Sequence, residues 1–177
     1  NPHKLPYNPL ALDATTQSKP MLPLHTANDI KETISSAFNL GNVQKQKLRD
    51  VIVAAYESKG IDKADKNTWN NTPPTVGDVC DIYLSDPSIS QDSLYAAISN
   101  LSDFEIFESD SSKTQSLYSL IDGVVVINLS GYDESIQNLI VAITLDAFYT
   151  QMQRHGHSSI DGSIRQIRKM ILVDEAD

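Results

Sequence analysis

The fold prediction starts from the run Met170-Ile171-Leu172-Val173-Asp174-Glu175-Ala176-Asp177. A short continuous apolar stretch of this kind favours a buried strand of a parallel sheet, and ligands of open α/β sheets bind beyond the carboxyl ends of such strands. Asp174 is therefore predicted to hold Mg²⁺, and Glu175 to orient an attacking water as general base. The alternative is that a buried strand simply ends here and Asp-Glu begins a surface loop.

The run matches a Walker B motif, whose carboxylate holds the Mg²⁺ of a bound nucleotide. Its usual companion is missing, because no stretch of the chain matches G-x-x-x-x-G-K-[ST]. The glycines are scattered, and none precedes Lys-Ser or Lys-Thr. We therefore expect an internal piece of a nucleotide hydrolase, with ATP and Mg²⁺ as cofactors of the parent protein. The piece alone is expected to lack ATPase activity.

A second strand is predicted at Gly123-Val124-Val125-Val126-Ile127-Asn128-Leu129-Ser130-Gly131, which is short, β-branched and bounded by glycines. A long helix should follow from Asp133 or Ser135 and end before Gly156. Strand, helix and strand in this order make one βαβ unit with a right-handed crossover. Asn128 ends the first strand and is a weak candidate for nucleotide binding, although capping of the strand is the favoured explanation.

The chain upstream of these strands predicts helices. Five prolines between Asn1 and Leu24 indicate an extended loop. Helical periodicity and capping residues then follow in four stretches. These stretches are 28–41, 43–60, 75–83 and 90–101. The predicted organisation is a proline-rich lead-in at 1–27, a helical subdomain at 28–120 and an α/β part at 121–177.

Composition excludes several classes of protein. The net charge of −9 opposes nonspecific binding to phosphate backbones, so any DNA contact should come through the parent protein. The single Cys80 excludes an internal disulfide and is compatible with a cytoplasmic location. The most apolar stretch, 139–148, contains a charge and is much shorter than the roughly 20 residues needed to span a bilayer. We therefore expect no membrane segment.

Other polar residues have ordinary explanations. His155 and His157 flank Gly156 without a further ligand at metal-binding spacing, which favours solvated loop histidines. Cys80 has no evident His partner, which favours a packed thiol. The cations near the second strand favour a solvated rim, with contact to DNA or to a neighbouring subunit's nucleotide as the alternative. These cations are Arg154, Arg165, Arg168 and Lys169.

Five segments, taken in order, resemble the middle of HerA/FtsK-type motor ATPases. They are Leu5-Pro6-Tyr7-Asn8-Pro9-Leu10, Ala54 to Ile61, Pro74 to Val79, Val125 to Ser130 and Ile171 to Asp177. The family carries a helical insertion between its two nucleotide motifs. Within this group, the sequence of these segments is most similar to HerA-like components of bacterial DNA phosphorothioation-dependent restriction systems.

The resemblance implies an α/β fold: a partial RecA-like P-loop NTPase core, with one βαβ unit ending at Walker B, and a predominantly helical insertion. It also implies a homo-oligomeric ring with ATP between subunits, DNA translocation coupled to restriction, and other restriction subunits as partners. Only Asp174 and Glu175 match nucleotide-site positions of the family. The chain departs from the family in lacking a P-loop and a visible arginine finger.

Two further functions compete with the motor. One is a helical protein-interaction module of a restriction complex without nucleotide chemistry of its own. The other is a DEAD-box RNA helicase, suggested by the letters of Asp174-Glu175-Ala176-Asp177. The helicase is disfavoured because upstream landmarks of the Pro-Thr-Arg-Glu-Leu type are absent.

Overall fold

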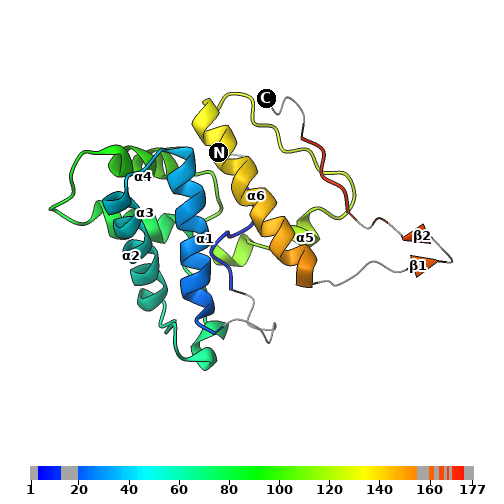
Figure 1. Ribbon diagram of the computed structural model, residues 1–177, viewed down its shortest axis with the longest axis horizontal. Helices are drawn as coiled ribbons and strands as arrows, with labels where there is room; N and C mark the ends of the chain where they lie inside the picture. Colours follow the sequence, from blue (N-terminus) through cyan, green and yellow to red (C-terminus); the bar gives the residue numbers. More distant parts are fainter. Residues whose placement is uncertain are drawn as a thin grey trace.

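The computed structural model describes residues 4–12, 20–154, 160–161, 164–165, 167 and 169–173. Within this part the architecture is a bundle of helices (Figure 1). The elements are α1 Leu22–Ala37, α2 Asn42–Ser58, η1 Lys66–Asn70, α3 Val76–Leu84, α4 Ser93–Phe104, η2 Ser111–Lys113, α5 Leu117–Leu120, α6 Glu134–Arg154, β1 Ile160–Asp161 and β2 Ile164–Arg165. Helix α1 lies between α2 and α6, with α3 and α4 beyond α2 and with α5 against α6.

Local signals place the helices close to where the sequence predicts them. Helix α2 follows Gly41 and ends at Ser58, two residues before Gly60, which adopts a φ of 70° that glycine tolerates best. Thr75 caps α3 and forms the expected capping box with Asp78. Helix α1 begins earlier than predicted because Pro23 lies in its first turn, where a missing N–H costs nothing.

The predicted α/β fold is wrong for the described residues. Residues 123–129 and 169–173 lie in no strand, and the strands that the structure does describe are the two-residue pair β1 and β2. These two strands are antiparallel, with Ile160 opposite Arg165. The described part therefore contains neither the βαβ unit nor a RecA-like core.

The physical reason for this error is the absence of a ladder partner. β-branched residues favour strands because they suit a half-buried pleated surface, and they do not form a strand without neighbours. Val124 is 97% exposed and Leu172 is 87% exposed, so neither run is the buried strand that its composition suggested. The helix predicted between them is confirmed as α6.

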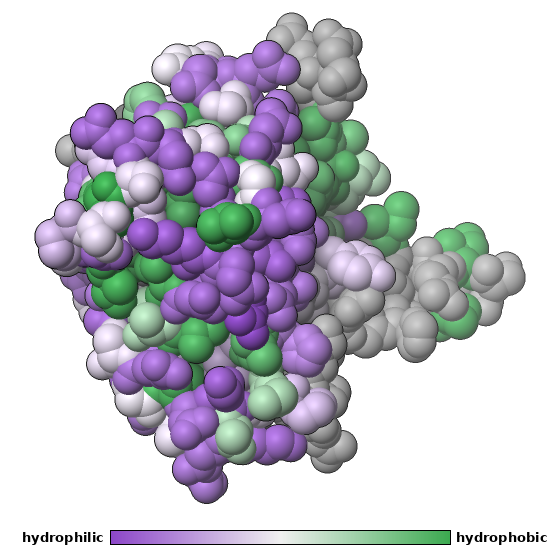
Figure 2. Space-filling model, turned by 60° about the vertical axis from the view of Figure 1, so that its left-hand side comes forward, coloured by the Kyte–Doolittle hydropathy of each residue, from purple (hydrophilic) through white to green (hydrophobic). Residues whose placement is uncertain are grey.

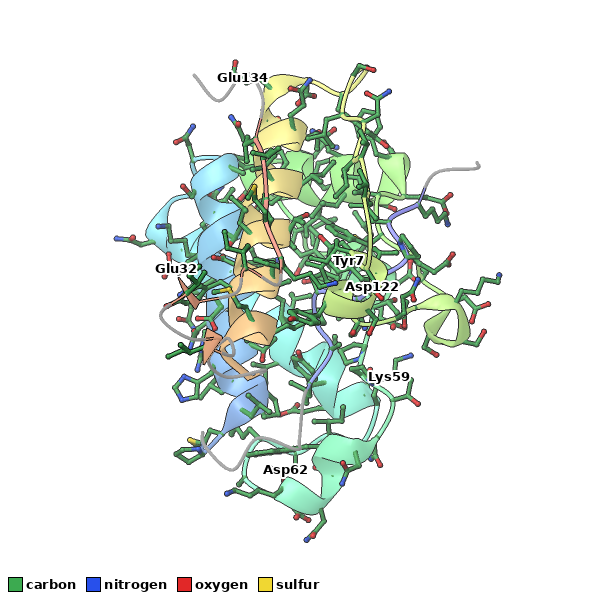
Figure 3. All side chains as sticks on the ribbon, turned by 90° about the vertical axis from the view of Figure 1, so that its right-hand side faces the viewer. Tyr7, Glu32, Lys59, Asp62, Asp122 and Glu134 are labelled. Carbon is green, nitrogen blue, oxygen red and sulfur yellow. The ribbon has the colours of Figure 1, made fainter. Side chains whose placement is uncertain are left out.

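Residues 5–10, here called the strap, cross the core of the bundle. Leu5 pairs with residues beyond α4, because its N–H donates to the Ile106 carbonyl at 2.8 Å and its carbonyl accepts from the Glu108 N–H at 3.0 Å. Tyr7 and Leu10 are each 1% exposed, and Figure 3 shows Tyr7 inside the molecule. This part of the predicted proline-rich lead-in is thus non-helical but packed, whereas residues 22–27 of the lead-in already belong to α1, contrary to the prediction.

Hydrogen bonds fasten the strap to three parts of the fold. The Tyr7 hydroxyl lies 2.8 Å from the Thr144 hydroxyl of α6, and the Tyr56 hydroxyl of α2 donates to the Leu10 carbonyl at 2.7 Å. The Asn8 amide nitrogen donates to the Pro74 carbonyl before α3 at 2.8 Å. Burial raises the pKa of Tyr7 to about 12, so its hydroxyl stays protonated.

The buried apolar residues form one cluster drawn from the strap and from helices α1 to α6. The largest fully buried members are Tyr7, Leu10, Leu48, Ile52, Tyr56, Ile61, Tyr83, Leu94, Ile98, Leu117, Ile136 and Leu139. This core draws on all three regions of the predicted organisation. Of the segments 123–129 and 169–173, Leu129 packs against this core.

Replacing Asn8 with Ala should lower the free energy of unfolding by about 2–4 kcal/mol, because it leaves the buried Pro74 carbonyl and Leu10 N–H without partners. The exposed Asn67→Ala is the control, with an expected change within about 0.5 kcal/mol. Urea unfolding followed by circular dichroism measures both variants. Equal stability of the two variants would show that the strap is not fastened through Asn8.

The Asp78 carboxylate should make stability depend on pH. Burial disfavours its charged form, but hydrogen bonds from Lys59 and Thr75 outweigh this and lower its pKa. A lowered folded-state pKa gives stability that is present above the unfolded value of about 3.9 and is lost as pH falls through the folded value. Asp78→Asn should flatten this acid limb in urea titrations between about pH 5 and 2, whereas exposed Asp103→Asn should retain it.

Candidate functional site

The predicted nucleotide site is only partly within the described chain. Asp174 and Glu175 lie outside the described residues, so their roles stay predictions. Asn128 is described and exposed, and its side-chain oxygen accepts from the Ser130 N–H at 2.9 Å. This bond is typical of an Asx turn, in which an Asn side chain organises its own backbone. The local role accounts for Asn128 without a ligand.

Two extended segments are described near the predicted site residues in the sequence: 123–129 contains Asn128, and 169–173 immediately precedes Asp174. Figure 1 shows both beside α6, on the side of the molecule away from α2. In both segments apolar side chains face solvent, with Val126 84% exposed and Met170 66% exposed. Within the described chain, the backbone N–H and C=O groups of 124–128 make no hydrogen bond. The segments therefore have the composition of strands without the pairing.

Lys169 tethers the second segment to the end of α5. Its ammonium donates to the Ile121 carbonyl at 2.9 Å and to the Asp122 carboxylate at 3.1 Å, and it lies 5.0 Å from the centre of the Tyr118 ring. The Asp122 side chain is 90% exposed, so the ion pair itself contributes little (Figure 3). The carbonyl bond and the cation–π contact with Tyr118 are the stronger restraints.

This tether assigns Lys169 a structural role that the sequence did not indicate. The prediction was a solvated rim of cations, but the Lys169 side chain is only 14% exposed. The side chains of Arg154, Arg165 and Arg168 lie outside the described residues. The tether directs the chain towards Asp174 from a defined point beside α5.

Helix α6 adds a second exposed apolar stripe on this side. Leu145, Tyr149 and Met152 follow one another at helical spacing and are 38%, 56% and 40% exposed. Its opposite face supplies the core residues Ile136, Leu139, Ile140 and Ile143. A helix with apolar residues on both faces is normally covered on both.

We call the exposed stripe of α6 and the two extended segments the C-terminal apolar surface. Its members are Val124, Val125, Val126, Leu145, Tyr149, Met152, Met170, Ile171, Leu172 and Val173. Apolar side chains gather along this edge of the molecule in Figure 2, whereas the face towards the viewer is mostly polar with scattered apolar side chains. Large exposed apolar patches of this kind mark sites of association.

The other residues considered for metal binding or nucleophilic chemistry are either buried and unreactive or outside the described residues. Cys80 is buried against the Ile98 carbonyl, and burial raises the pKa of its thiol to about 12, which confirms a packed thiol. His155 and His157 fall outside the described residues. Among the residues that are described, no group of three or more His, Cys, Asp or Glu side chains could hold a metal ion.

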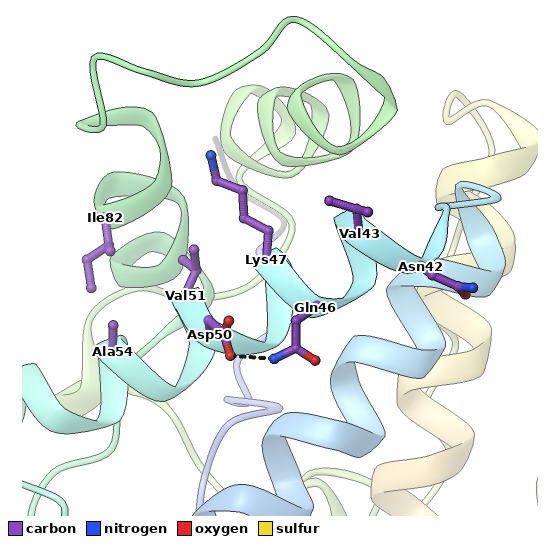
Figure 4. Close-up of a pocket in the computed structure, with 8 residues that line it drawn as sticks. All are labelled: Asn42, Val43, Gln46, Lys47, Asp50, Val51, Ala54 and Ile82. Carbon is purple, nitrogen blue, oxygen red and sulfur yellow. Dashed lines mark hydrogen bonds between the residues drawn. The ribbon is translucent and has the colours of Figure 1, made fainter.

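Two shallow grooves lie elsewhere on the bundle. One groove of about 700 Å³ runs along α2 and α3 (Figure 4) and is lined by Asn42, Val43, Gln46, Lys47, Asp50, Val51, Ala54 and Ile82. Its Gln46 amide donates to the Asp50 carboxylate at 2.8 Å, so these polar groups satisfy each other. The other groove, of about 730 Å³, lies between α1 and α6. Both are open, unlike the enclosed sites that bury most of a small ligand.

Comparisons with known proteins leave this surface as the main evidence about function. No model of a known protein family matches the chain, and no curated protein matches it. Across the described residues, every helix is too short or too polar to cross a bilayer.

Replacing Lys169 with Met should loosen the 169–173 segment, because it removes the bonds to Ile121 and Asp122 and the contact with Tyr118. We expect limited proteolysis by subtilisin within 169–173 to accelerate at least about threefold, with cleavage of the helices unchanged. Exposed Lys63→Met is the matched control and should leave the cleavage rate as it was. Equal cleavage rates in both variants would rule out the tether.

Proposed function

We propose that this chain is the helical section of an ATP-driven DNA motor in a bacterial phosphorothioation-dependent restriction system. The main support is the exposed apolar run 170–173, which leads directly into Asp174-Glu175. An apolar run of this kind is stabilised when another polypeptide removes it from water, at about 25 cal/mol per Å² of buried area. The proposal that the larger assembly is a DNA motor rests on the resemblance to HerA/FtsK-type ATPases.

In this proposal the chain contributes only part of a nucleotide site. Asp174 would hold the Mg²⁺ of ATP, and Glu175 would take a proton from the attacking water. Asn128 would be at most an accessory, since its side chain serves a local turn. The phosphate-binding amides and lysine must come from elsewhere, because the sequence carries no P-loop.

The proposal also assigns the partners. DNA would be contacted by other parts of the motor, because a chain of net charge −9 repels a phosphate backbone. Ring formation with further copies, docking of other restriction subunits and a cytoplasmic location belong to the same proposal and rest on the resemblance.

A second candidate is a helical protein-interaction module without nucleotide chemistry. The observation that favours it is the C-terminal apolar surface, which includes the exposed stripe of α6 and extends well beyond the two carboxylates. Such a module would still need a partner on this surface, but it would not need Glu175. The two candidates therefore differ in what a change at Glu175 does.

Glu175→Gln in the full-length protein should leave ATP affinity within about threefold and reduce ATP turnover at least about 100-fold, because removing a general base costs roughly 10²–10⁴ in rate. Exposed Glu57→Gln is the control and should turn over ATP normally. Initial-rate ATPase assays and equilibrium nucleotide binding measure both quantities. We expect the 177-residue chain alone to show no hydrolysis.

Undiminished hydrolysis by the Glu175→Gln protein would remove Glu175 from the role of base. A full-length protein that neither binds nor hydrolyses ATP, yet still joins its complex, would favour the interaction module.

A further inference from the structure

We infer that residues 124–128 are a docking edge for one β-strand of a partner polypeptide. The inference rests on the proposal that another polypeptide covers the C-terminal apolar surface, and it adds the mode of contact. An extended backbone with unpaired N–H and C=O groups is a template for strand pairing. A partner strand would satisfy these groups through a main-chain ladder, the mode known as β-augmentation.

The side chains of this segment already alternate as those of a half-covered strand do. Val124 and Val126 are 97% and 84% exposed, whereas Val125 between them is 44% exposed. The alternation continues, because Ile127 is half-buried, Asn128 is exposed and Leu129 packs against the core. Successive residues of a strand point to opposite faces, so one face of this segment lies on the helical layer. Among the described residues, no backbone is hydrogen-bonded along its edge.

The charges near the segment indicate the chemistry of the partner. Asp133 and Glu134 lie exposed at the start of α6, just beyond Gly131. Hydrogen bonds from Ser135 and from the Ile136 N–H lower the pKa of Asp133, so it is ionised at neutral pH. Complementary charge then favours a strand with Lys or Arg at the end beside these carboxylates. The occupant we propose is an apolar, alternating strand with a basic end, carried by a different polypeptide.

The probe is a fluorescein-labelled synthetic peptide of alternating valine and threonine with two lysines at one end, titrated with the 177-residue chain. Val125→Pro and Val126→Pro each remove one backbone N–H, and these two N–H groups point to opposite edges of the segment. One of the two variants should weaken binding at least about tenfold and so identify the docking edge. The matched Val125→Thr and Val126→Thr keep the N–H and the β-branch and should change binding less than about threefold.

Several outcomes would overturn the inference. The first is that the peptide does not bind at concentrations up to about 1 mM. The second is that both proline variants bind the peptide as well as the unchanged chain does. The third is that a peptide N-methylated at alternate amides binds as tightly as the unmethylated peptide. Helical circular dichroism and the melting temperature of each variant show that the bundle is intact. Sedimentation tests whether a second copy of the chain occupies the edge instead. Self-association that the peptide disrupts would assign the edge to that second copy.

The peptide result and the ATPase result are separable. A strand that docks on a protein without ATPase activity would leave the inference standing while the motor proposal fails. A full-length protein with ATPase activity, together with a 177-residue chain that does not bind the peptide, would support the motor proposal and overturn the inference.

Discussion

Asn8 bridges two stretches of backbone that lie 66 residues apart in the sequence. Its amide donates to the Pro74 carbonyl before α3, and its oxygen accepts from the N–H of Leu10. These groups are buried, so each needs a partner inside the protein. With Tyr7 bonded to α6 and the Leu10 carbonyl bonded to α2, the strap joins the two sides of the bundle through its centre. The helices pack around a short extended segment as well as against one another.

The same construction explains why one side of the molecule stays apolar and exposed. The buried faces of α1 and α6 pack against each other, and they also pack against α2 and α5. The outer stripe of α6 and the segments at 123–129 and 169–173 then have no helix of this chain to cover them among the described residues. Lys169 holds the second segment in place at the end of α5 without removing its apolar side chains from water.

Sequence reasoning succeeded where the deciding interactions are local. Caps, glycine stops and apolar periodicity lie within a few residues of each helix, so α2, α3 and α6 could be predicted. It failed for Val124 to Leu129, because strand formation depends on a neighbour that local composition does not specify. The roles of Tyr7 and Asn8 were also missed. Two large side chains around an Asn-Pro pair were the available signal, but the density of prolines pointed to a loop.

By itself, the sequence determined the approximate positions of α2, α3, α4 and α6, the absence of an internal disulfide and the presence of two short apolar runs that a strand could use. It also placed Asp174-Glu175 directly after the second run. Only the tertiary structure decided that the strap is buried, that Lys169 binds the end of α5 and that both runs remain unpaired in the described chain. The physical reason is range: a cap or a helical face is set by residues three or four positions apart, whereas a buried polar bond or a strand ladder needs partners that only folding brings together.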